Sequence, residues 1–128
     1  LGMDLKSFKI AVLGATFKPD SDDVRDSPAL DIAAQIHATG AKVCVHDPKG
    51  IEPARKRFPA LTFSESIEDC VAGADLILHL TEWKQYRELD PATIKKLVKQ
   101  AKILDGRNML DREKWQMAGW DFHALGRA

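Results

Sequence analysis

Short apolar segments alternate with segments of helical spacing along almost the whole chain, and this alternation limits the possible folds most strongly. The main apolar segments are KIAVLG at 9–14, AKVCVHDP at 41–48, ADLILHLT at 74–81 and KILDG at 102–106. They do not alternate with polar residues, which is typical of strands that are buried on both faces. Such strands, each followed by a helix, predict a parallel sheet with helices on both sides.

Residue pairs that start or stop helices lie between these strands. Ser27 and Pro28 have the order of an N-cap and a first helical residue, and Gly40 ends the helical spacing that follows. Asp90 and Pro91 form a second such pair. Helices are expected at 28–39, 51–58, 66–74 (with Ser64 or Ser66 as N-cap), 90–101 and 112–120, a short strand at 61–64, an edge strand at 121–125, and a loop at 81–86.

The predicted fold class is therefore α/β: a doubly wound, mainly parallel sheet between two layers of helices, similar to a Rossmann fold. The 128 residues are enough for one domain, and we predict a single domain over 1–128. The opening LGMDLKSFKIAVLG reaches its first strand within about ten residues, so we expect a fragment of a longer chain.

The charge balance excludes some classes of partner. The chain has 19 basic and 19 acidic residues, so no overall field favours nucleic acid or an anionic membrane. No apolar run approaches the roughly 20 residues of a membrane span, and no signal peptide opens the chain. We therefore expect a cytoplasmic protein that binds neither nucleic acid nor membrane.

Cysteine and histidine do not form a recognisable site. Cys44 and Cys70 lie in or beside apolar segments without a CxxC spacing, which indicates two buried thiols. The four histidines lack paired metal spacing, and His46 and His79 lie in predicted strands as core residues, so no metal is expected. The three tryptophans are expected to pack at the periphery: Trp83, Trp115 and Trp120.

The loop after the first strand, GATFKPDSDDVRDSP at 14–28, has the position of a dinucleotide-binding loop but not its glycines. Four aspartates crowd the start of the next helix, where a phosphate would bind, so this loop alone is not expected to hold NAD. Lys18 and Arg25 remain as cations at the carboxyl edge of the sheet, and Arg107 follows the strand at 102–106. The alternatives are a solvated Lys18, an Arg25 that only pairs with the aspartates, and an Arg107 that is an ordinary turn residue.

Three segments together carry a resemblance. The segments are IAVLGATFKPDSDDVRDSPALDI, VCVHDPKG, and LHLTEWKQYRELD together with KILDGRNML. They resemble the C-terminal domain of the UDP-glucose/GDP-mannose dehydrogenase family over about residues 9–125. The first loop is more similar to that of UDP-glucose 6-dehydrogenases than to that of the GDP-mannose branch. The resemblance implies an enzyme that oxidises the C6 alcohol of a nucleotide sugar twice, with two NAD and a cysteine-bound thioester.

The resemblance also implies a division of labour between domains. In this family an N-terminal Rossmann domain holds NAD and the cysteine nucleophile, a helical segment forms the dimer, and the C-terminal domain covers the UDP-sugar. Phe17 and Lys18 match the pair that approaches the nucleotide sugar, Arg107 matches an arginine that contacts substrate, and Arg25 matches one that reaches NAD. Neither Cys44 nor Cys70 matches the nucleophile, so no catalytic residue is expected here.

The predicted function is therefore that of the UDP-sugar-binding domain of an NAD-dependent UDP-glucose 6-dehydrogenase, inactive on its own and part of a homodimer or larger homo-oligomer. Two alternatives stay open. One is a dehydrogenase for another nucleotide sugar, such as UDP-N-acetylmannosamine or GDP-mannose. The other is a nucleotide-sensing module without catalytic activity.

Overall fold

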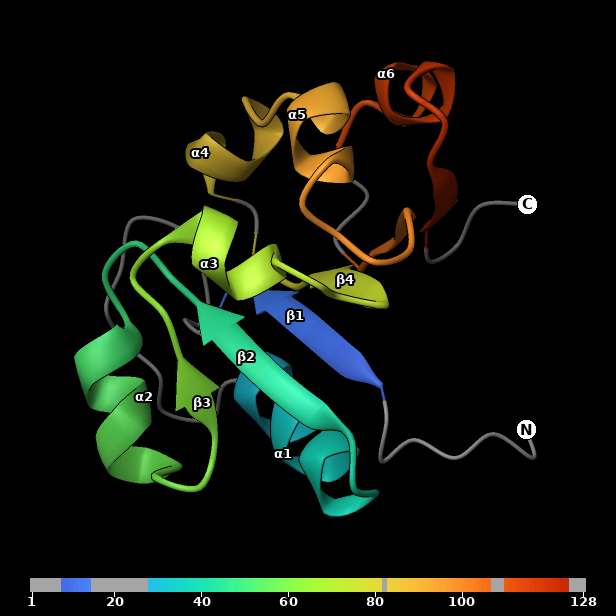
Figure 1. Cartoon of the computed structure of the whole chain (residues 1–128). Helices are drawn as coiled ribbons and strands as arrows, with labels where there is room; N and C mark the ends of the chain where they lie inside the picture. Colours follow the sequence, from blue (N-terminus) through green and yellow to red (C-terminus); the bar gives the residue numbers. More distant parts are fainter. Residues whose placement is uncertain (1–7, 15–27, 82, 107–109, 125–128) are drawn as a thin grey trace.

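The computed structural model of the chain describes residues 8–14, 28–81, 83–106 and 110–124 (Figure 1). The strands and helices alternate as the sequence predicts. In chain order they are β1 Lys9–Leu13, α1 Pro28–Ala38, β2 Lys42–His46, α2 Ile51–Arg57, β3 Thr62–Phe63, α3 Ile67–Val71, β4 Leu76–His79, α4 Lys84–Arg87, α5 Pro91–Lys95, β5 Lys102–Asp105, α6 Arg112–Met117 and β6 Asp121–Ala124.

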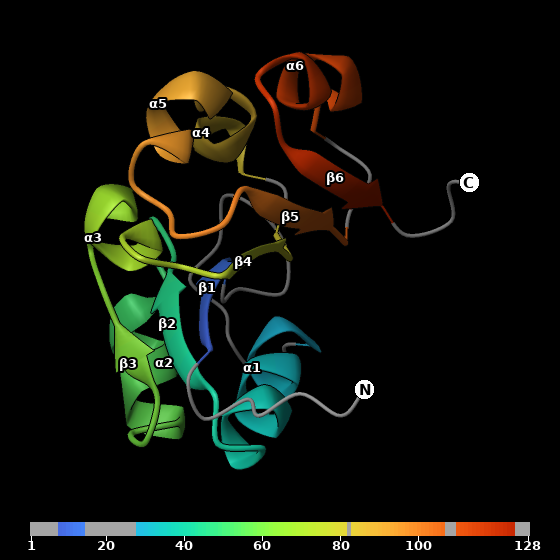
Figure 2. The same ribbon diagram turned by 45° about the vertical axis from the view of Figure 1, so that its right-hand side comes forward.

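The six strands form one sheet in the order β3-β2-β1-β4-β5-β6, and every neighbouring pair is parallel (Figure 2). The chain therefore builds outward from β1 in one direction and from β4 in the other. This is the strand order of a doubly wound Rossmann-type sheet, so the predicted fold class is confirmed. The expected edge strand is present as β6, which pairs with β5.

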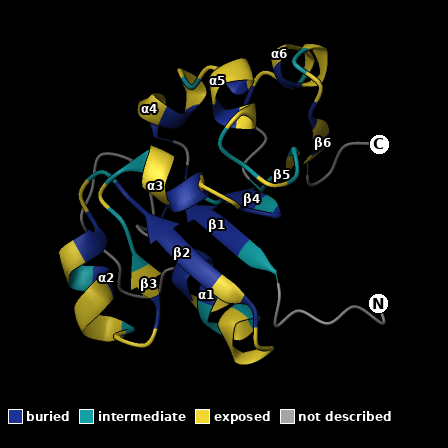
Figure 3. Cartoon of the chain, viewed as in Figure 1, coloured by how far each residue is buried: buried dark blue, intermediate teal, exposed yellow. Residues whose placement is uncertain are grey.

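Each face of the sheet carries its own hydrophobic core. Ile10 and Val12 of β1 pack on the side of α1 and α2, whereas Ala11 and Leu13 pack on the side of α3 to α6. Since successive strand residues point to opposite faces, a strand covered on both sides must be apolar at every position. Figure 3 shows the result: the strands of the sheet centre are buried, and the exposed residues lie mainly on the outer faces of the helices.

Two of the expected capping residues start helices on the α3 to α6 side of the sheet, at α3 and α5. The Ser66 hydroxyl accepts a hydrogen bond from the Asp69 N–H at the start of α3, and the Asp90 carboxylate accepts one from the Ala92 N–H at the start of α5. The helix expected over 90–101 is shorter, however, because α5 ends at Lys95. The N–H groups of Lys99 and Gln100 donate to the Ala74 carbonyl, so a tertiary contact takes the backbone out of the helix.

The prediction of peripheral tryptophans is wrong. Trp83, Trp115 and Trp120 are only 5%, 1% and 4% exposed and belong to the core under α3 to α6. Trp115 and Trp120 meet edge to face with ring centroids 4.9 Å apart, and the Trp120 indole N–H donates to the Pro91 carbonyl. Helices as short as α4, α5 and α6 carry few side chains, so large aromatic rings fill the space above β4 to β6.

One expectation concerned the membrane. Among the described residues, no helix combines the length and the apolar composition needed to cross a bilayer.

Candidate functional site

The carboxyl ends of β1 and β4 mark the place where the two halves of the sheet diverge. In open parallel sheets ligands bind outside this edge, so the segments that follow the strands form the candidate site. The structure places Gly14, Asp47 and Gly106 there, directly after β1, β2 and β5, and Thr81 two residues after the end of β4. The short helix α4 begins at Lys84, within the segment 81–86 that was expected as a loop.

Gly14 holds the centre of this edge. Its N–H donates to the His46 carbonyl at 2.7 Å, and its φ of +115° is a conformation that residues with a side chain rarely adopt. A Cβ atom at this position would meet the Thr81 hydroxyl and lie 2.6 Å from the Thr81 backbone nitrogen. The segments after β1 and β4 therefore touch at a point where only glycine fits.

Asp47 stands at the end of β2, where a dinucleotide-binding domain places its ribose-binding acid. Its Oδ1 accepts hydrogen bonds from the N–H groups of Lys49 and Gly50, at 2.9 and 2.7 Å. Its Oδ2 accepts one from the indole N–H of Trp83 at 3.2 Å. The carboxylate is thus buried and engaged in shaping the turn after β2 and fixing the start of α4.

Tyr86 of α4 lies beneath this edge, against the end of β2. Its hydroxyl donates to the His46 carbonyl at 3.0 Å and lies 2.8 Å from Nδ1 of the same histidine. Burial raises the pKa of Tyr86 well above its usual value and lowers the pKa of His46. Both side chains are therefore neutral at pH 7 and act as structural hydrogen-bonding groups.

A second polar pair supports the turn after β5. Nδ1 of His79 lies 2.8 Å from Oδ1 of Asp105, and Oδ2 of Asp105 accepts a hydrogen bond from the Leu110 N–H at 2.8 Å. The Gly106 N–H donates to the His79 carbonyl at 2.9 Å. Gly106 and Leu110 are thereby anchored on the sheet at either side of residues 107–109. Nε2 of His79 is buried and has no hydrogen-bond partner among the residues that the structure describes.

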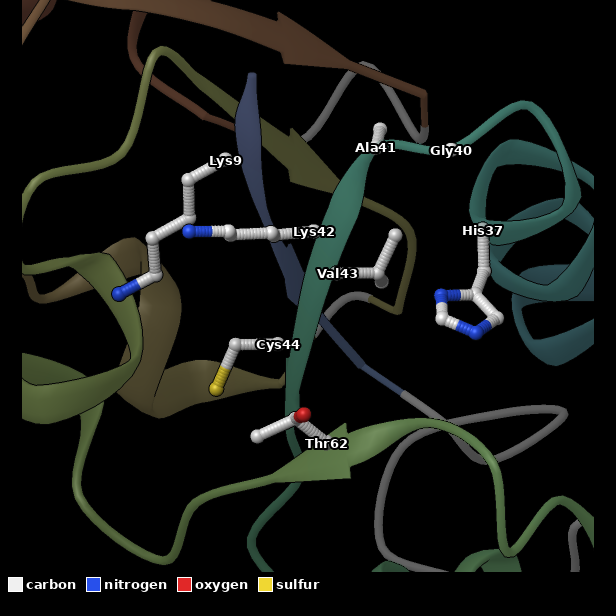
Figure 4. A pocket seen from close by; sticks show the side chains of 8 residues that line it. All are labelled: Lys9, His37, Gly40, Ala41, Lys42, Val43, Cys44 and Thr62. Atoms are coloured by element: carbon white, nitrogen blue, oxygen red, sulfur yellow. The ribbon is translucent and has the colours of Figure 1, made fainter. Parts of the chain in front are cut away.

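Two cavities differ in their place and charge. One of about 310 Å³ lies at the carboxyl edge, and its lining residues include three acidic ones, Asp47, Glu52 and Glu65, against one basic one, Lys49. These carboxylates would repel a phosphate. The other, of about 430 Å³, lies by the start of β1 and β2, away from the carboxyl edge (Figure 4). Within the described part of the chain, no three His, Cys, Asp or Glu residues are grouped to hold a metal ion.

The four residues predicted to bind ligands are Phe17, Lys18, Arg25 and Arg107. All of them lie outside the described residues, so their roles stay predictions. The structure adds a supporting layer that sequence analysis missed: Thr81 against Gly14, Trp83 with Asp47, and Tyr86 with His46. Of these contacts, only the one at Gly14 could have been predicted from the sequence, because a glycine that ends a buried strand often marks the close approach of another segment.

Comparison with known proteins agrees with this arrangement. The model of the UDP-glucose/GDP-mannose dehydrogenase family, UDP binding domain, matches residues 11–112. The UDP-glucose 6-dehydrogenase of Rhizobium meliloti (strain 1021) is 37% identical over 126 residues, which are 98% of this chain and 29% of that protein. The UDP-glucose 6-dehydrogenase of Rickettsia prowazekii (strain Madrid E) is 39% identical over 126 residues, 96% of this chain and 29% of that protein.

Among solved structures, the NDP-N-acetyl-D-galactosaminuronic acid dehydrogenase of Methanosarcina mazei Go1 superposes with a TM-score of 0.85. It is 31% identical and is matched over 98% of this chain and 26% of that one. The chain thus spans less than a third of the length of the relatives it matches. The resemblance found in the sequence is confirmed: the chain belongs to the UDP-glucose/GDP-mannose dehydrogenase family and corresponds to its UDP-binding domain.

Proposed function

We propose that this chain is the nucleotide-sugar-binding domain of a longer, NAD-dependent UDP-glucose 6-dehydrogenase, which oxidises the sugar C6 alcohol twice to give UDP-glucuronate. The observation that supports this proposal most strongly is the match of residues 11–112 to the UDP-binding domain of the family. UDP-glucose 6-dehydrogenases also align with nearly the whole chain. In this proposal residues 1–128 are one domain, and a separate N-terminal domain holds NAD and the nucleophile. A cytoplasmic homodimer or larger homo-oligomer is part of the same proposal.

The residues assigned to ligand binding all follow strands at the carboxyl edge. Phe17 and Lys18 are proposed to approach the nucleotide sugar, and Arg107 to grip its diphosphate or sugar hydroxyls with both arms of its guanidinium. The anchored positions Gly106 and Leu110 support this, because they hold the backbone on either side of Arg107.

NAD does not fit the described residues of this chain in the usual way. Gly14 is followed by no second glycine at the spacing of a pyrophosphate loop. The Asp47 carboxylate already accepts hydrogen bonds from the N–H groups of Lys49 and Gly50 and from the Trp83 indole, and two glutamates line the cavity beside it. We therefore assign only Arg25 of this chain to NAD, as a contact across a domain interface.

Neither cysteine of the chain is assigned to catalysis. Cys44 lies in the middle of β2 and Cys70 in α3, both buried in the core and away from the carboxyl edge. Nucleophilic catalysis needs a group that can reach the substrate carbon. We therefore expect no dehydrogenase activity from the isolated chain.

The alternative substrate is another nucleotide sugar. The observation that favours it is the TM-score of 0.85 with the Methanosarcina mazei enzyme, whose name specifies a different sugar. Since the fold and edge are shared, the sugar must be decided by side chains that contact it. The third possibility, a module that only senses nucleotides, predicts that the parent protein produces no NADH from any UDP-sugar.

Titration of the isolated chain, followed by backbone amide NMR, tests the binding site. We expect UDP to bind with a dissociation constant of about 1 mM, because part of the site belongs to another domain. The shifts should cluster on Gly14, Phe17, Lys18 and Arg107, and NAD should bind no more tightly than UDP. Tight NAD binding at Gly14 would overturn the assignment.

Kinetics of the parent enzyme test the reaction and the role of the lysine. Lys18→Ala should lower kcat/KM for UDP-glucose by the equivalent of about 2–4 kcal/mol, as expected for a lost charge-assisted hydrogen bond in a closed site. Lys49→Ala is the matched control, because Lys49 is an exposed lysine near the same edge. Equal effects of the two changes would favour a solvated Lys18. Comparing NADH formation from UDP-glucose and from N-acetylated UDP-sugars decides the substrate.

A further inference from the structure

The two cysteines of the chain lie against each other beneath α3. Cys44 is in β2, paired in register with Ala11 of β1 and Thr62 of β3, and Cys70 is in α3, which packs on β1 and β2. The Cys70 thiol donates a hydrogen bond to the Cys44 carbonyl at 3.3 Å, and both side chains belong to the same core cluster. Two thiols that are 26 residues apart in the sequence are thus neighbours in the fold.

The two thiols are chemically unequal. The adjacent Cys70 thiol, together with the charge of Lys9, lowers the pKa of Cys44 to about 7, although burial acts against this. The adjacent Cys44 side chain and burial raise the pKa of Cys70 above that of an ordinary thiol. Because a thiolate is the nucleophilic form, Cys44 is the group suited to attack and Cys70 the group suited to follow.

The larger cavity gives a small molecule access to one of them. It has a volume of about 430 Å³, and its lining includes Cys44, Lys9 and Lys42 as well as His37 and Val43, which lie on the other side of β2 (Figure 4). In Figure 4 the sulfur of Cys44 and the amines of both lysines lie on the same side of β2. Cys70 does not line this cavity and has no exposed surface. Of the two cysteines, Cys44 is therefore the one that borders the cavity.

We propose that Cys44 and Cys70 form an oxidation site that reacts with hydrogen peroxide to give a disulfide within the chain. The Cys44 thiolate attacks one oxygen of the peroxide, the O–O bond breaks, and the released hydroxide takes a proton to become water. Cys44 is then a sulfenic acid. The Cys70 sulfur loses its proton and attacks the Cys44 sulfur, the S–O bond breaks, and a second water leaves. The two thiols together lose two electrons, and the peroxide is reduced to two waters.

This site is independent of the proposed nucleotide-sugar function, because it lies away from the carboxyl edge of the sheet. The disulfide joins β2 to α3 and closes a loop that contains α2 and β3. A cross-link of this kind restricts the unfolded chain and should raise the midpoint of unfolding. Disulfides in cytosolic proteins are commonly transient and redox-sensing, which suits a pair that is reduced in the resting state.

Mass spectrometry of the full 128-residue chain tests the site. The chain contains no cysteines other than Cys44 and Cys70, so any disulfide within one chain must join these two. After treatment with an equimolar amount of hydrogen peroxide, the monomer should lose two hydrogens and both free thiols. A peptide map without reductant should link the peptides of Cys44 and Cys70, and dithiothreitol should reverse the change. Retention of both free thiols, or a link only between two chains, would overturn the proposal.

Two variants assign the roles of the cysteines, and the far-UV circular dichroism spectrum of each checks its fold. Cys70→Ala should stop at a sulfenic acid on Cys44 that dimedone traps. Cys44→Ala should react with peroxide about a hundredfold more slowly at pH 7, because the remaining thiol is almost fully protonated. Equal rates for Cys44→Ala and the unchanged chain would refute the assignment of the nucleophile. If a variant does not fold, the peptide map of the unchanged chain still decides whether the disulfide forms.

Discussion

Replacing Gly14 with alanine tests the contact that closes the centre of the carboxyl edge. The backbone at Gly14 has φ +115°, and an added Cβ would lie 2.6 Å from the backbone nitrogen of Thr81 and 2.5 Å from its Cβ. A side chain could rotate away, but the Thr81 backbone is held by the strand pairing of β4 and by the Leu80 N–H bond to the Leu13 carbonyl. The alanine must therefore displace one strand end or the other.

The expected loss of stability has two parts. Placing a residue with a Cβ at this φ costs about 1–3 kcal/mol. Inserting a methyl group into a packed contact adds about 1–3 kcal/mol. We therefore expect Gly14→Ala to lower the free energy of unfolding by about 4 kcal/mol. For an m value of about 2 kcal/mol per M, this shifts the urea midpoint by about 2 M.

The chain offers two matched controls. Gly73 also has a positive φ, +72°, but an added Cβ would meet nothing within 4 Å, so Gly73→Ala should cost only about 1 kcal/mol of backbone strain. At Gly119, with φ +94°, the added Cβ would meet the end of the Lys95 side chain, which can move aside. Gly119→Ala should therefore resemble Gly73→Ala.

Urea unfolding of the three variants, followed by circular dichroism at one pH and temperature, gives the comparison. The difference between Gly14→Ala and the two controls reports the steric contact with Thr81 together with any difference in backbone strain, and Gly119 is the better reference for strain because its φ of +94° is nearer to that of Gly14. Equal destabilisation by Gly14→Ala and the controls, or a loss below about 1 kcal/mol for Gly14→Ala, would refute the reasoning.

Three further predictions concern the edge of the sheet. Trp83→Phe removes the hydrogen bond from the indole N–H to the Asp47 carboxylate and should lower the free energy of unfolding, measured in urea, by about 1–2 kcal/mol. An unchanged urea midpoint would mean that this hydrogen bond contributes nothing to stability. Burial lowers the pKa of His46 in the folded chain, so on acidification the unfolded chain binds a proton before the folded chain does. The free energy of unfolding should therefore be highest above about pH 6.5 and fall as the pH drops below it, by at most about 1.4 kcal/mol per pH unit. His46→Phe should reduce the dependence of the free energy of unfolding on pH below about pH 6.5, and an unaltered slope would contradict this assignment. In the parent enzyme, Arg107→Lys should raise KM for the UDP-sugar several-fold and leave KM for NAD nearly unchanged, since a lysine cannot copy a two-armed contact; a larger change for NAD would reverse the assignment.

The local sequence pattern was enough to predict the fold class. Uniformly apolar strands such as KIAVLG need a cover on both faces, and they alternate with helices whose starts are marked by pairs such as Asp90–Pro91. These are properties of neighbouring residues, so no knowledge of distant contacts was required. The same holds for the family, because its segments are continuous in the chain. The residues expected to bind the ligand were also named in this way, and their roles stay predictions.

The tertiary structure decided which distant residues meet. α5 ends at Lys95 because residues 99–100 bond to Ala74, and the tryptophans are buried because short helices leave space above the sheet. Asp47 meets Trp83, and Cys44 meets Cys70, only because the strand order brings the end of β2 beside β1 and places α3 over both. A local pattern specifies the conformation of a segment and the face that it buries, whereas its partners depend on how all segments pack together.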